Sequence, residues 1–137
     1  MTMIAEEVVR SYFERMGAGD ARGAFGLFAS PFSYRVMGTT PISHVSHTMA
    51  ELVENTLRPF TSRLVDSRIE IIPDEYIVDG NAVVVLAHSK SVAVTGMPYE
   101  NEYAMVFRVE DGKITAICEY LDTALVETAV FGKKLVD

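Results

Sequence analysis

The sequence predicts an α+β fold, in which helices come first and a run of antiparallel strands follows. Apolar residues in roughly the first sixty positions recur mainly with the 3.6-residue period of helices, interrupted by one strand-like stretch. From about residue 67 the period changes to two. The segments Asp-Gly-Asn, Thr-Gly-Met-Pro and Glu-Asp-Gly-Lys divide this part into four strand-like runs, and the last two segments are typical of hairpin turns. The expected order of elements is therefore α-α-β-α-β-β-β-β.

Two helices are expected at the start of the chain. The apolar stripe of the first recurs every four residues and comprises Ile4, Val8, Tyr12 and Met16. The segment Gly-Ala-Gly-Asp ends this pattern, and Asp20 is a suitable N-cap for a short second helix. The apolar side of that second helix is expected to extend to Phe28, before Ser30 and Pro31 stop it.

One strand and a third helix are expected next. Alternation over Phe32–Met37 predicts a strand, and the Gly-Thr-Thr-Pro segment after it predicts a loop that reaches His47. Thr48 and Glu51 have the spacing of a capping box, which predicts the start of the third helix. Pro59 is expected to close this helix, because proline cannot donate the next helical hydrogen bond.

Composition limits the class of protein. A chain of 137 residues can bury a sizeable core, so one domain over residues 1–137 is expected. Nineteen acidic and 12 scattered basic residues give a formal charge of −7, which disfavours nucleic acid as a partner. No apolar run approaches the roughly 18 residues of a membrane span, and the first ten residues include two acids. We therefore expect a cytoplasmic protein that does not bind membranes.

Motifs for metals, cofactors and nucleophiles are sparse. No Gly-rich phosphate loop or ligand cluster occurs, so neither a cofactor nor a metal is expected. His44 and His47 lie three residues apart, but no Asp or Cys is near them in sequence, which favours loop or pocket-rim roles. Cys118 is the single cysteine, and a small buried strand residue is a simpler interpretation than a nucleophile.

The closing segment VFRVEDGKITAICEYLDT and the order of elements resemble the nuclear transport factor 2-like superfamily, also called SnoaL-like or ketosteroid-isomerase-like. The resemblance covers nearly the whole chain. Within the superfamily, the Gly-Lys-Ile-Thr start and the Glu-Tyr-Leu-Asp end of the last strand are most similar to limonene-1,2-epoxide hydrolase. The resemblance implies a cone, in which a strongly curved, mainly antiparallel sheet wraps round a pocket and helices close it. It also implies a homodimer.

The resemblance further implies which side chains face the pocket. Glu119 falls on the position of an inward-facing catalytic acid, and Tyr34 falls on the position of a pocket tyrosine. Alternation along the strands then gives the other expected pocket residues, which are Val36, His88, Lys90, Asn101, Tyr103, Met105, Phe107 and Leu121, with Leu86 and Val92 in the same register as His88.

Two groups within the superfamily have catalytic residues that this chain lacks. The epoxide hydrolases carry an Arg and an Asp two residues apart and an Asn on the first strand, where this chain has His88, Lys90 and Val36. The ketosteroid isomerases carry an oxyanion-hole acid where this chain has Met105, and a general-base Asp that the first strand here does not supply. The expected pocket therefore keeps Tyr34 and Glu119 but replaces the residues that assist them.

These residue types suit acid/base chemistry on a small, mostly apolar molecule. Burial raises the pKa of a carboxyl group and a neighbouring His88 or Lys90 cation lowers it, so the pKa of Glu119 could lie near neutrality. Glu119 is predicted to be the base and His88 its partner acid, with Tyr34 or Tyr103 donating a hydrogen bond to a substrate oxygen.

Three functions are consistent with this predicted pocket. Epoxide hydrolysis is the leading reaction because of the match in the last strand. Isomerisation or polyketide-type cyclisation is the near alternative, and it needs the same base without a held water. The third is a non-catalytic module that binds a small hydrophobic molecule or mediates assembly. The structural alternative for Glu119 itself is a pair with Lys90 that completes a buried polar network.

Overall fold

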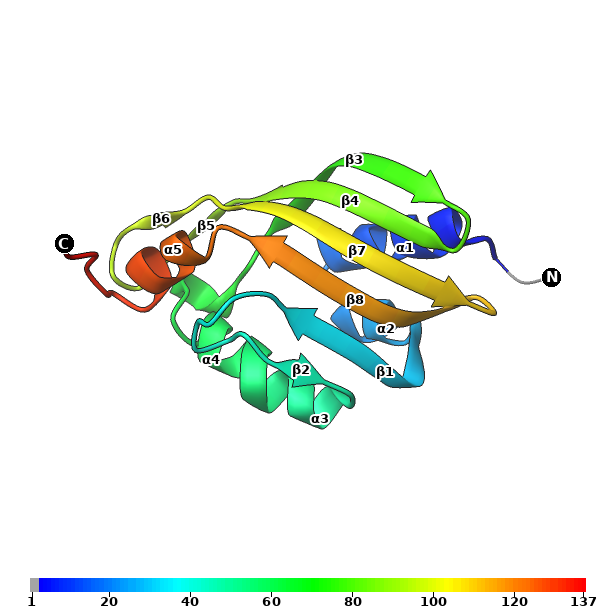
Figure 1. Cartoon of the computed structure of the whole chain (residues 1–137), viewed down its shortest axis with the longest axis horizontal. Coiled ribbons are helices and arrows are strands. Elements are labelled where there is room, and N and C mark those ends of the chain that lie inside the picture. Colours follow the sequence, from blue (N-terminus) through cyan, green and yellow to red (C-terminus); the bar gives the residue numbers. More distant parts are fainter. Residues whose placement is uncertain (1–2) are drawn as a thin grey trace.

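The computed structural model describes residues 3–137 and contains a six-stranded sheet with helices α1 and α2 behind it in the view of Figure 1. The sheet has the order β2-β1-β8-β7-β4-β3, and only the β1–β8 pair is parallel. The strands are β1 (Phe28–Val36), β2 (Val45–Ser46), β3 (Ile71–Asp79), β4 (Ala82–Ser89), β7 (Glu102–Glu110) and β8 (Lys113–Leu121). A curved, mainly antiparallel sheet combined with helices confirms the predicted α+β cone.

The helices are short apart from the first. Their bounds are α1 (Ala5–Gly17), α2 (Ala21–Phe25), α3 (Met49–Leu52), α4 (Arg58–Thr61) and α5 (Thr123–Leu125), with a 3-10 turn at Val65–Ser67 and π-helical turns at Val53–Leu57 and Val126–Val130. The segment from α3 through the first π turn to α4 is helical without interruption. None of the helices within residues 3–137 has the length and apolar character needed to cross a membrane.

The opening helices form as predicted but the second is shorter. Asp20 caps α2, since its carboxylate accepts the Gly23 N–H at 2.9 Å. Phe28 is not helical, contrary to the prediction. It already belongs to β1 and pairs with Ile114 of β8, so sheet pairing takes this residue from the helix.

Pro59 does not close the third helix as predicted. The N-terminal cap is present, because the Thr48 hydroxyl accepts the Glu51 N–H at 3.2 Å. The helical segment then continues to Thr61, because the π turn directly before the proline changes the hydrogen-bonding pattern. There the Arg58 N–H donates to the Val53 carbonyl, five residues back, which widens the helix where proline removes a donor.

Three hairpin loops connect the strands of the second half. The β3–β4 and β7–β8 loops each have two residues, and Asp111 and Gly112 of the latter adopt φ values of 49° and 75°, as a type I′ turn requires. The third loop joins the short strands β5 (Ser91–Val92) and β6 (Pro98–Tyr99), which extend the β4–β7 ladder. Of the five residues between these strands, Ala93 and Met97 still pair, because the Ala93 N–H donates to the Met97 carbonyl. The turn itself therefore has three residues, 94–96, and Gly96 takes a φ of +91°.

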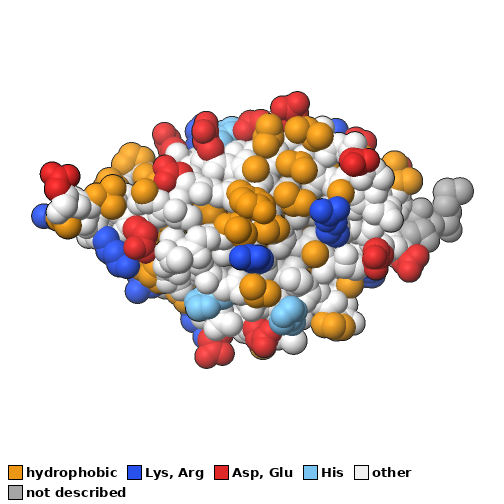
Figure 2. Space-filling view, in the orientation of Figure 1, with side chains coloured by type: hydrophobic (Ala, Val, Ile, Leu, Met, Phe, Trp, Pro, Cys, Tyr) orange, Lys and Arg blue, Asp and Glu red, His pale blue; other side chains and the backbone are white. Residues whose placement is uncertain are grey.

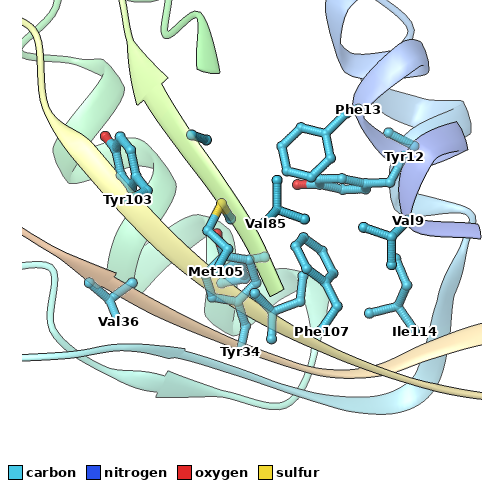
Figure 3. Packing of buried hydrophobic residues seen from close by; sticks show 14 of the residues in the cluster. Val9, Tyr12, Phe13, Tyr34, Val36, Val85, Tyr103, Met105, Phe107 and Ile114 are labelled. Atoms are coloured by element: carbon cyan, nitrogen blue, oxygen red, sulfur yellow. The ribbon is translucent and has the colours of Figure 1, made fainter. Parts of the chain in front are cut away.

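The core lies between one face of the sheet and the helices. Figure 3 shows Tyr12 and Phe13 projecting from α1 towards Val85 and Phe107 of the sheet. The Phe107 ring centroid lies 5.7 Å from the centroids of both α1 rings. Side chains at alternate positions along β4 and β7 are buried in this core, and those between them point to the outer face.

Candidate active site

A cavity lies between the inner face of the sheet and the helices. It has a wide part of about 760 Å³ and a narrow part of about 80 Å³. The two parts share the wall residues Tyr12, Met16, Phe25, Tyr34, Leu57, Thr61, Ile69 and Ile71. The exposed residues Ser67, Arg68 and Glu70 line the wide part, which therefore opens to the surface. Glu119 lines the narrow part, so its carboxylate lies at the inner end of a largely apolar cavity.

Glu119 and Tyr34 are brought together by the parallel pairing of β1 with β8. In this register Val36 is opposite Glu119, which places Tyr34 two residues away on the same inner face. The Tyr34 hydroxyl donates a hydrogen bond to Oε1 of Glu119 at 3.0 Å. Oε2 has no hydrogen-bond partner within residues 3–137, and it remains available to a molecule in the cavity.

Burial controls the pKa of Glu119. The side chain is 7% exposed, and loss of hydration raises the pKa from 4.5 to about 7, while the hydrogen bond from Tyr34 opposes this shift. No Lys, Arg or His within the described residues forms an ion pair with it. Near neutral pH the carboxyl group is thus divided between its two protonation states, as suits a group that both takes and returns a proton.

Tyr12, Tyr34 and Tyr103 are three of the four buried tyrosines that line the narrow part of the cavity with Glu119. Burial, followed by the charge of Glu119, raises the pKa of Tyr12 and of Tyr34. Burial also raises the pKa of Tyr103 well above its ordinary value, with smaller contributions from Tyr99 and Glu119. All three phenols therefore stay protonated at neutral pH and can donate hydrogen bonds.

The prediction that His88 and Lys90 face the pocket is wrong. Ala87 of β4 is directly opposite Tyr103 of β7, so it is Ala87 that shares the inner face with this tyrosine. The reason is the turn of three residues, 94–96, which the paired Ala93 and Met97 enclose between β5 and β6. A turn with an odd number of residues pairs odd-numbered residues of β4 with odd-numbered residues of β7. The predicted alternation paired even-numbered with odd-numbered residues, which requires a turn with an even number of residues. A register shift of one residue moves every side chain of the strand to the other face of the sheet.

The outer face of the sheet holds the residues that were expected inside. His88 lies opposite Glu102, and its Nδ1 is 2.8 Å from a carboxylate oxygen of Asp74 on β3. Lys90 is exposed beyond the end of β4. Leu86 also points outward, and Val92 is exposed. Neither His88 nor Lys90 can act as a partner of Glu119 in this structure.

The other expected pocket residues are all buried or partly buried on the inner face. Tyr103 and Leu121 line the narrow part of the cavity with Glu119, and Met105 lines the wide part. The remaining three, Val36, Phe107 and Asn101, are at most 3% exposed but do not line the cavity. They support the walls rather than touching a ligand.

Several cavity residues were not expected from the sequence. Tyr12 was assigned to the apolar stripe of α1, and a phenol within such a stripe is the signal that could have marked it as a pocket residue. Tyr99 lines the narrow part, yet it follows a proline in a turn-rich segment that carries no periodic signal. Leu57, Ile69 and Ile71 come from the helical segment and from the segment that enters β3, and only the tertiary fold brings them to the cavity.

The two loop histidines and the cysteine lie outside the cavity walls. His44 Nε2 and His47 Nδ1 each lie 3.0 Å from a backbone carbonyl oxygen, of Pro41 and Phe32 respectively. Within residues 3–137 no three His, Cys, Asp or Glu side chains are grouped as metal ligands. Cys118 is partly buried on the outer face of β8, next to Glu119 in sequence but opposite in direction.

A family model for the SnoaL-like domain matches residues 9–117, which include β1, most of the sheet and the start of β8. The chain belongs to the SnoaL-like domain family. The superfamily resemblance predicted from the order of elements and the closing segment is thereby confirmed. No curated protein matches this SnoaL-like domain.

Solved structures support the same fold for this SnoaL-like domain. A nuclear transport factor 2-like protein of unknown function from Burkholderia pseudomallei superposes with a TM-score of 0.81 at 21% identity, covering 92% of this chain and 96% of that one. A Bacillus subtilis protein described as an isomerase gives 0.75 at 18% identity, covering 96% of each chain. A Jannaschia protein described as a SnoaL-like polyketide cyclase gives 0.74 at 18% identity, covering 95% and 93%.

Proposed function

We propose that this SnoaL-like domain is a cofactor-free acid/base enzyme that isomerises or cyclises a small, mostly apolar molecule. The observation that carries the proposal is Glu119, a buried carboxylate with a pKa of about 7 at the inner end of the cavity. One of its oxygens is held by Tyr34 and the other is free for a substrate. The isomerase and cyclase descriptions of two proteins of the same fold agree with this class of reaction.

The proposed reaction begins with proton transfer from carbon to Glu119. The carboxylate takes a proton from a carbon next to a substrate carbonyl, and the C–H electron pair forms a carbon–carbon double bond while the carbonyl π electrons move to oxygen. A tyrosine hydroxyl donates a hydrogen bond to that oxygen. In isomerisation the protonated Glu119 then returns its proton to another carbon. In cyclisation the carbon of the enolate attacks a second carbonyl within the same molecule, whose oxygen takes the proton.

Proton shuttling needs fewer protein groups than hydrolysis does. Hydrolysis of an epoxide requires a water held by several partners, and Asn101 cannot supply one because both ends of its amide already bind protein groups. His88 and Lys90 lie on the other face of the sheet. The site therefore offers one carboxylate and several phenols, which favours a reaction in which one proton moves from the substrate to Glu119 and then returns to the substrate.

Deuterium exchange tests the proposal without knowledge of the natural substrate. A panel of aryl ketones and cyclic enones is incubated with the protein in D₂O, and exchange at the carbon next to the carbonyl is followed by NMR. We expect the wild type to catalyse exchange at a rate that rises with pH through about pH 7, since the base is the ionised form of Glu119. Glu119→Gln should abolish this catalysis and its pH profile.

Exchange that is equally fast with Glu119→Gln would contradict the proposal, and absence of exchange with every ketone would favour a binding module. Epoxide hydrolysis remains a second candidate, supported by the tyrosines that line the cavity with Glu119 and could donate to an epoxide oxygen. Terpene and aryl epoxides in ¹⁸O-labelled water test it. Labelled diol from the wild type but not from Glu119→Gln would establish hydrolysis.

We also propose that two copies of the chain associate through the outer face of the sheet. Side chains between the buried positions of β4, β7 and β8 are largely apolar there, namely Val84, Leu86, Ala104, Val106, Ala116, Cys118 and Tyr120. Tyr120 is 46% exposed, and Ile77 of β3 is 48% exposed at the edge of this set. Figure 2 shows hydrophobic side chains gathered along the middle of this face, as in an interaction surface.

A charge placed on this face tests the homodimer. Val106→Glu should shift the mass measured by light scattering from two chains to one, because a carboxylate in an apolar contact would lose its hydration. Val94→Glu is the matched control, since Val94 is 62% exposed in the β5–β6 loop, outside this face. A wild-type protein that is monomeric at high concentration would contradict the proposal.

A further inference from the structure

A buried chain of hydrogen bonds ends at the narrow part of the cavity. Asn101, Tyr99 and Tyr103 are 1%, 0% and 5% exposed. Nδ2 of Asn101 donates to the Tyr99 hydroxyl at 2.9 Å, and the hydroxyl oxygens of Tyr99 and Tyr103 lie 2.8 Å apart. The direction of the second hydrogen bond decides whether the proton of Tyr103 points back along the chain or into the cavity.

The orientation of the Asn101 amide is fixed by backbone groups whose roles are not interchangeable. Oδ1 accepts the N–H groups of Glu102 at 2.7 Å and of Asp122 at 3.1 Å. Nδ2 donates to the Asp122 carbonyl at 3.0 Å. A rotated amide would place its NH₂ group against two N–H donors and its oxygen against a carbonyl. Nδ2 must therefore be the atom that donates to Tyr99.

The direction then follows along the chain. Asn101 donates a hydrogen bond to the Tyr99 hydroxyl oxygen, so Tyr99 must donate its own hydroxyl proton to a different acceptor. Within residues 3–137 the acceptor in hydrogen-bond contact is the Tyr103 oxygen. If Tyr103 donated instead, the Tyr99 proton would be buried without a partner, which is costly. Tyr99 therefore donates to Tyr103, and the proton of Tyr103 is left for a third group.

We propose that Asn101 and Tyr99 direct the hydroxyl proton of Tyr103 into the narrow part of the cavity, where it binds an uncharged carbonyl oxygen of the substrate. This inference rests on the proposed function and names its substrate class. Tyr103 lines the narrow part together with Glu119, so the donor and the base meet the same end of a ligand. Tyr103 is the group that touches substrate, and Tyr99 and Asn101 are positioning residues.

The surroundings favour a neutral oxygen over an anionic ligand. The partly ionised Glu119 shares the narrow part and would repel a carboxylate or phosphate. The walls shared by the two parts are mostly apolar, which suits a hydrocarbon body. The ligand expected is an apolar ketone, aldehyde or ester whose carbonyl enters first. As negative charge grows on the carbonyl oxygen of the substrate, each hydrogen bond in the chain Asn101–Tyr99–Tyr103 becomes stronger, because linked hydrogen bonds polarise one another.

Binding of 2-acetylnaphthalene and 2-ethylnaphthalene tests the inference, because the two probes share the naphthalene ring and a two-carbon substituent and differ in the carbonyl oxygen. We expect the wild type to prefer the ketone by about 3- to 10-fold, the range of one net hydrogen bond. Tyr103→Phe should remove this preference and leave the affinity for 2-ethylnaphthalene unchanged. Tyr120→Phe, which deletes a hydroxyl on the outer face, is the matched control and should change neither affinity.

The decisive variant is Asn101→Asp, which keeps an acceptor at Oδ1 and removes the NH₂ donor. Tyr99 should then donate to the new carboxylate and accept from Tyr103, so the Tyr103 proton is withdrawn from the cavity. We expect loss of the ketone preference, and the infrared stretch of a ¹³C-labelled carbonyl in bound 2-acetylnaphthalene should return towards its value in an apolar solvent. Tyr99→Phe should weaken the same carbonyl shift partly, because Tyr103 loses its donor.

Four results would overturn the inference. These are equal binding of both probes by the wild type, no binding of the ketone, an unchanged preference in Tyr103→Phe, and an Asn101→Asp variant that weakens both probes equally. The last result would indicate a merely structural role. Glu119→Gln separates the two proposals, because it should stop deuterium exchange yet retain the ketone preference.

Discussion

The inner and outer faces of the sheet are built from alternate residues of the same strands, yet they differ in chemistry. On the inner face Glu119 has lost its hydration, and Tyr34 is its direct hydrogen-bond partner. On the outer face Nδ1 of His88 lies 2.8 Å from a carboxylate oxygen of Asp74, and the two side chains are 40% and 51% exposed. A His–carboxylate pair looks more like a catalytic dyad than a lone carboxylate does. The comparison teaches that burial, more than residue type, is what raises the pKa of Glu119 towards neutrality.

The largest expected difference between the faces is in activity. Glu119→Gln should lower the rate of ketone exchange by about 10²- to 10⁴-fold, the usual contribution of a positioned acid or base. His88→Gln and Lys90→Gln should stay within about twofold of the wild type, since both residues face away from the cavity. The values of kcat/KM for the ketone that exchanges fastest measure this. A tenfold loss in His88→Gln would show that the outer face takes part in the reaction.

The pH dependence of stability should distinguish the faces next. The folded state raises the pKa of Glu119 from 4.5 to about 7, so it binds this proton more tightly than the unfolded chain does. The contribution of Glu119 to the free energy of unfolding is largest below about pH 4.5, falls as the pH rises to about 7, and is constant above that. The total decrease is about 3 kcal/mol. Urea unfolding from pH 4 to 8 measures it.

Glu119→Gln should remove this loss, so that its stability relative to the wild type improves from pH 4.5 to pH 7. The control is Glu75→Gln, which neutralises an exposed carboxylate on β3. The assignment of the titration to burial would be wrong if both variants changed the pH dependence by the same amount.

Two adjacent valines on β4 sharpen the comparison in the core. Val85 is fully buried on the inner face, whereas Val84 is partly exposed on the outer face. Val85→Ala should lower the free energy of unfolding by about 2 kcal/mol, from lost burial and a cavity. Val84→Ala should lower it by about 0.5 kcal/mol in a monomer. Chemical denaturation measures both, and equal losses would contradict the assignment of faces.

The smallest effect is expected from the contact between His88 and Asp74 on the outer face. Asp74→Asn should change the free energy of unfolding by less than about 0.5 kcal/mol, since exposed pairs gain little in water. The same urea unfolding, at pH 6 and in low and high salt, measures this. A loss of several kcal/mol would mean that the pair is covered, for example by a second copy of the chain.

The sequence was sufficient for the class of fold and for one strand of the site. The change of period from 3.6 to 2 and the turn segments predicted the order of helices and long strands, because these patterns are local. The family resemblance placed Glu119 of the last strand inward and Tyr34 of the first strand in the pocket. Both placements agree with the hydrogen bond between the two side chains.

The rest depended on features that are not local. The face on which His88 lies is set by the number of residues in the β5–β6 loop, and the Thr-Gly-Met-Pro segment is compatible with more than one number. Tyr99 lines the narrow part of the cavity, and its hydroxyl accepts a hydrogen bond from Asn101, which directly precedes β7. No pattern in a single sequence indicates that Asn101 binds the backbone of Asp122, twenty-one residues later.

The difference in volume between the two parts of the cavity has a consequence for regiochemistry. Only about 80 Å³ is available beside Glu119, against about 760 Å³ in the part that opens to the surface. A long or branched substrate can bring just one end to the carboxylate, while its bulk remains in the wide part. In the proposed reaction, the carbon that loses its proton would then be selected by the shape of the molecule rather than by the relative acidity of its C–H bonds. A compound with two equally acidic positions would react at the less crowded end.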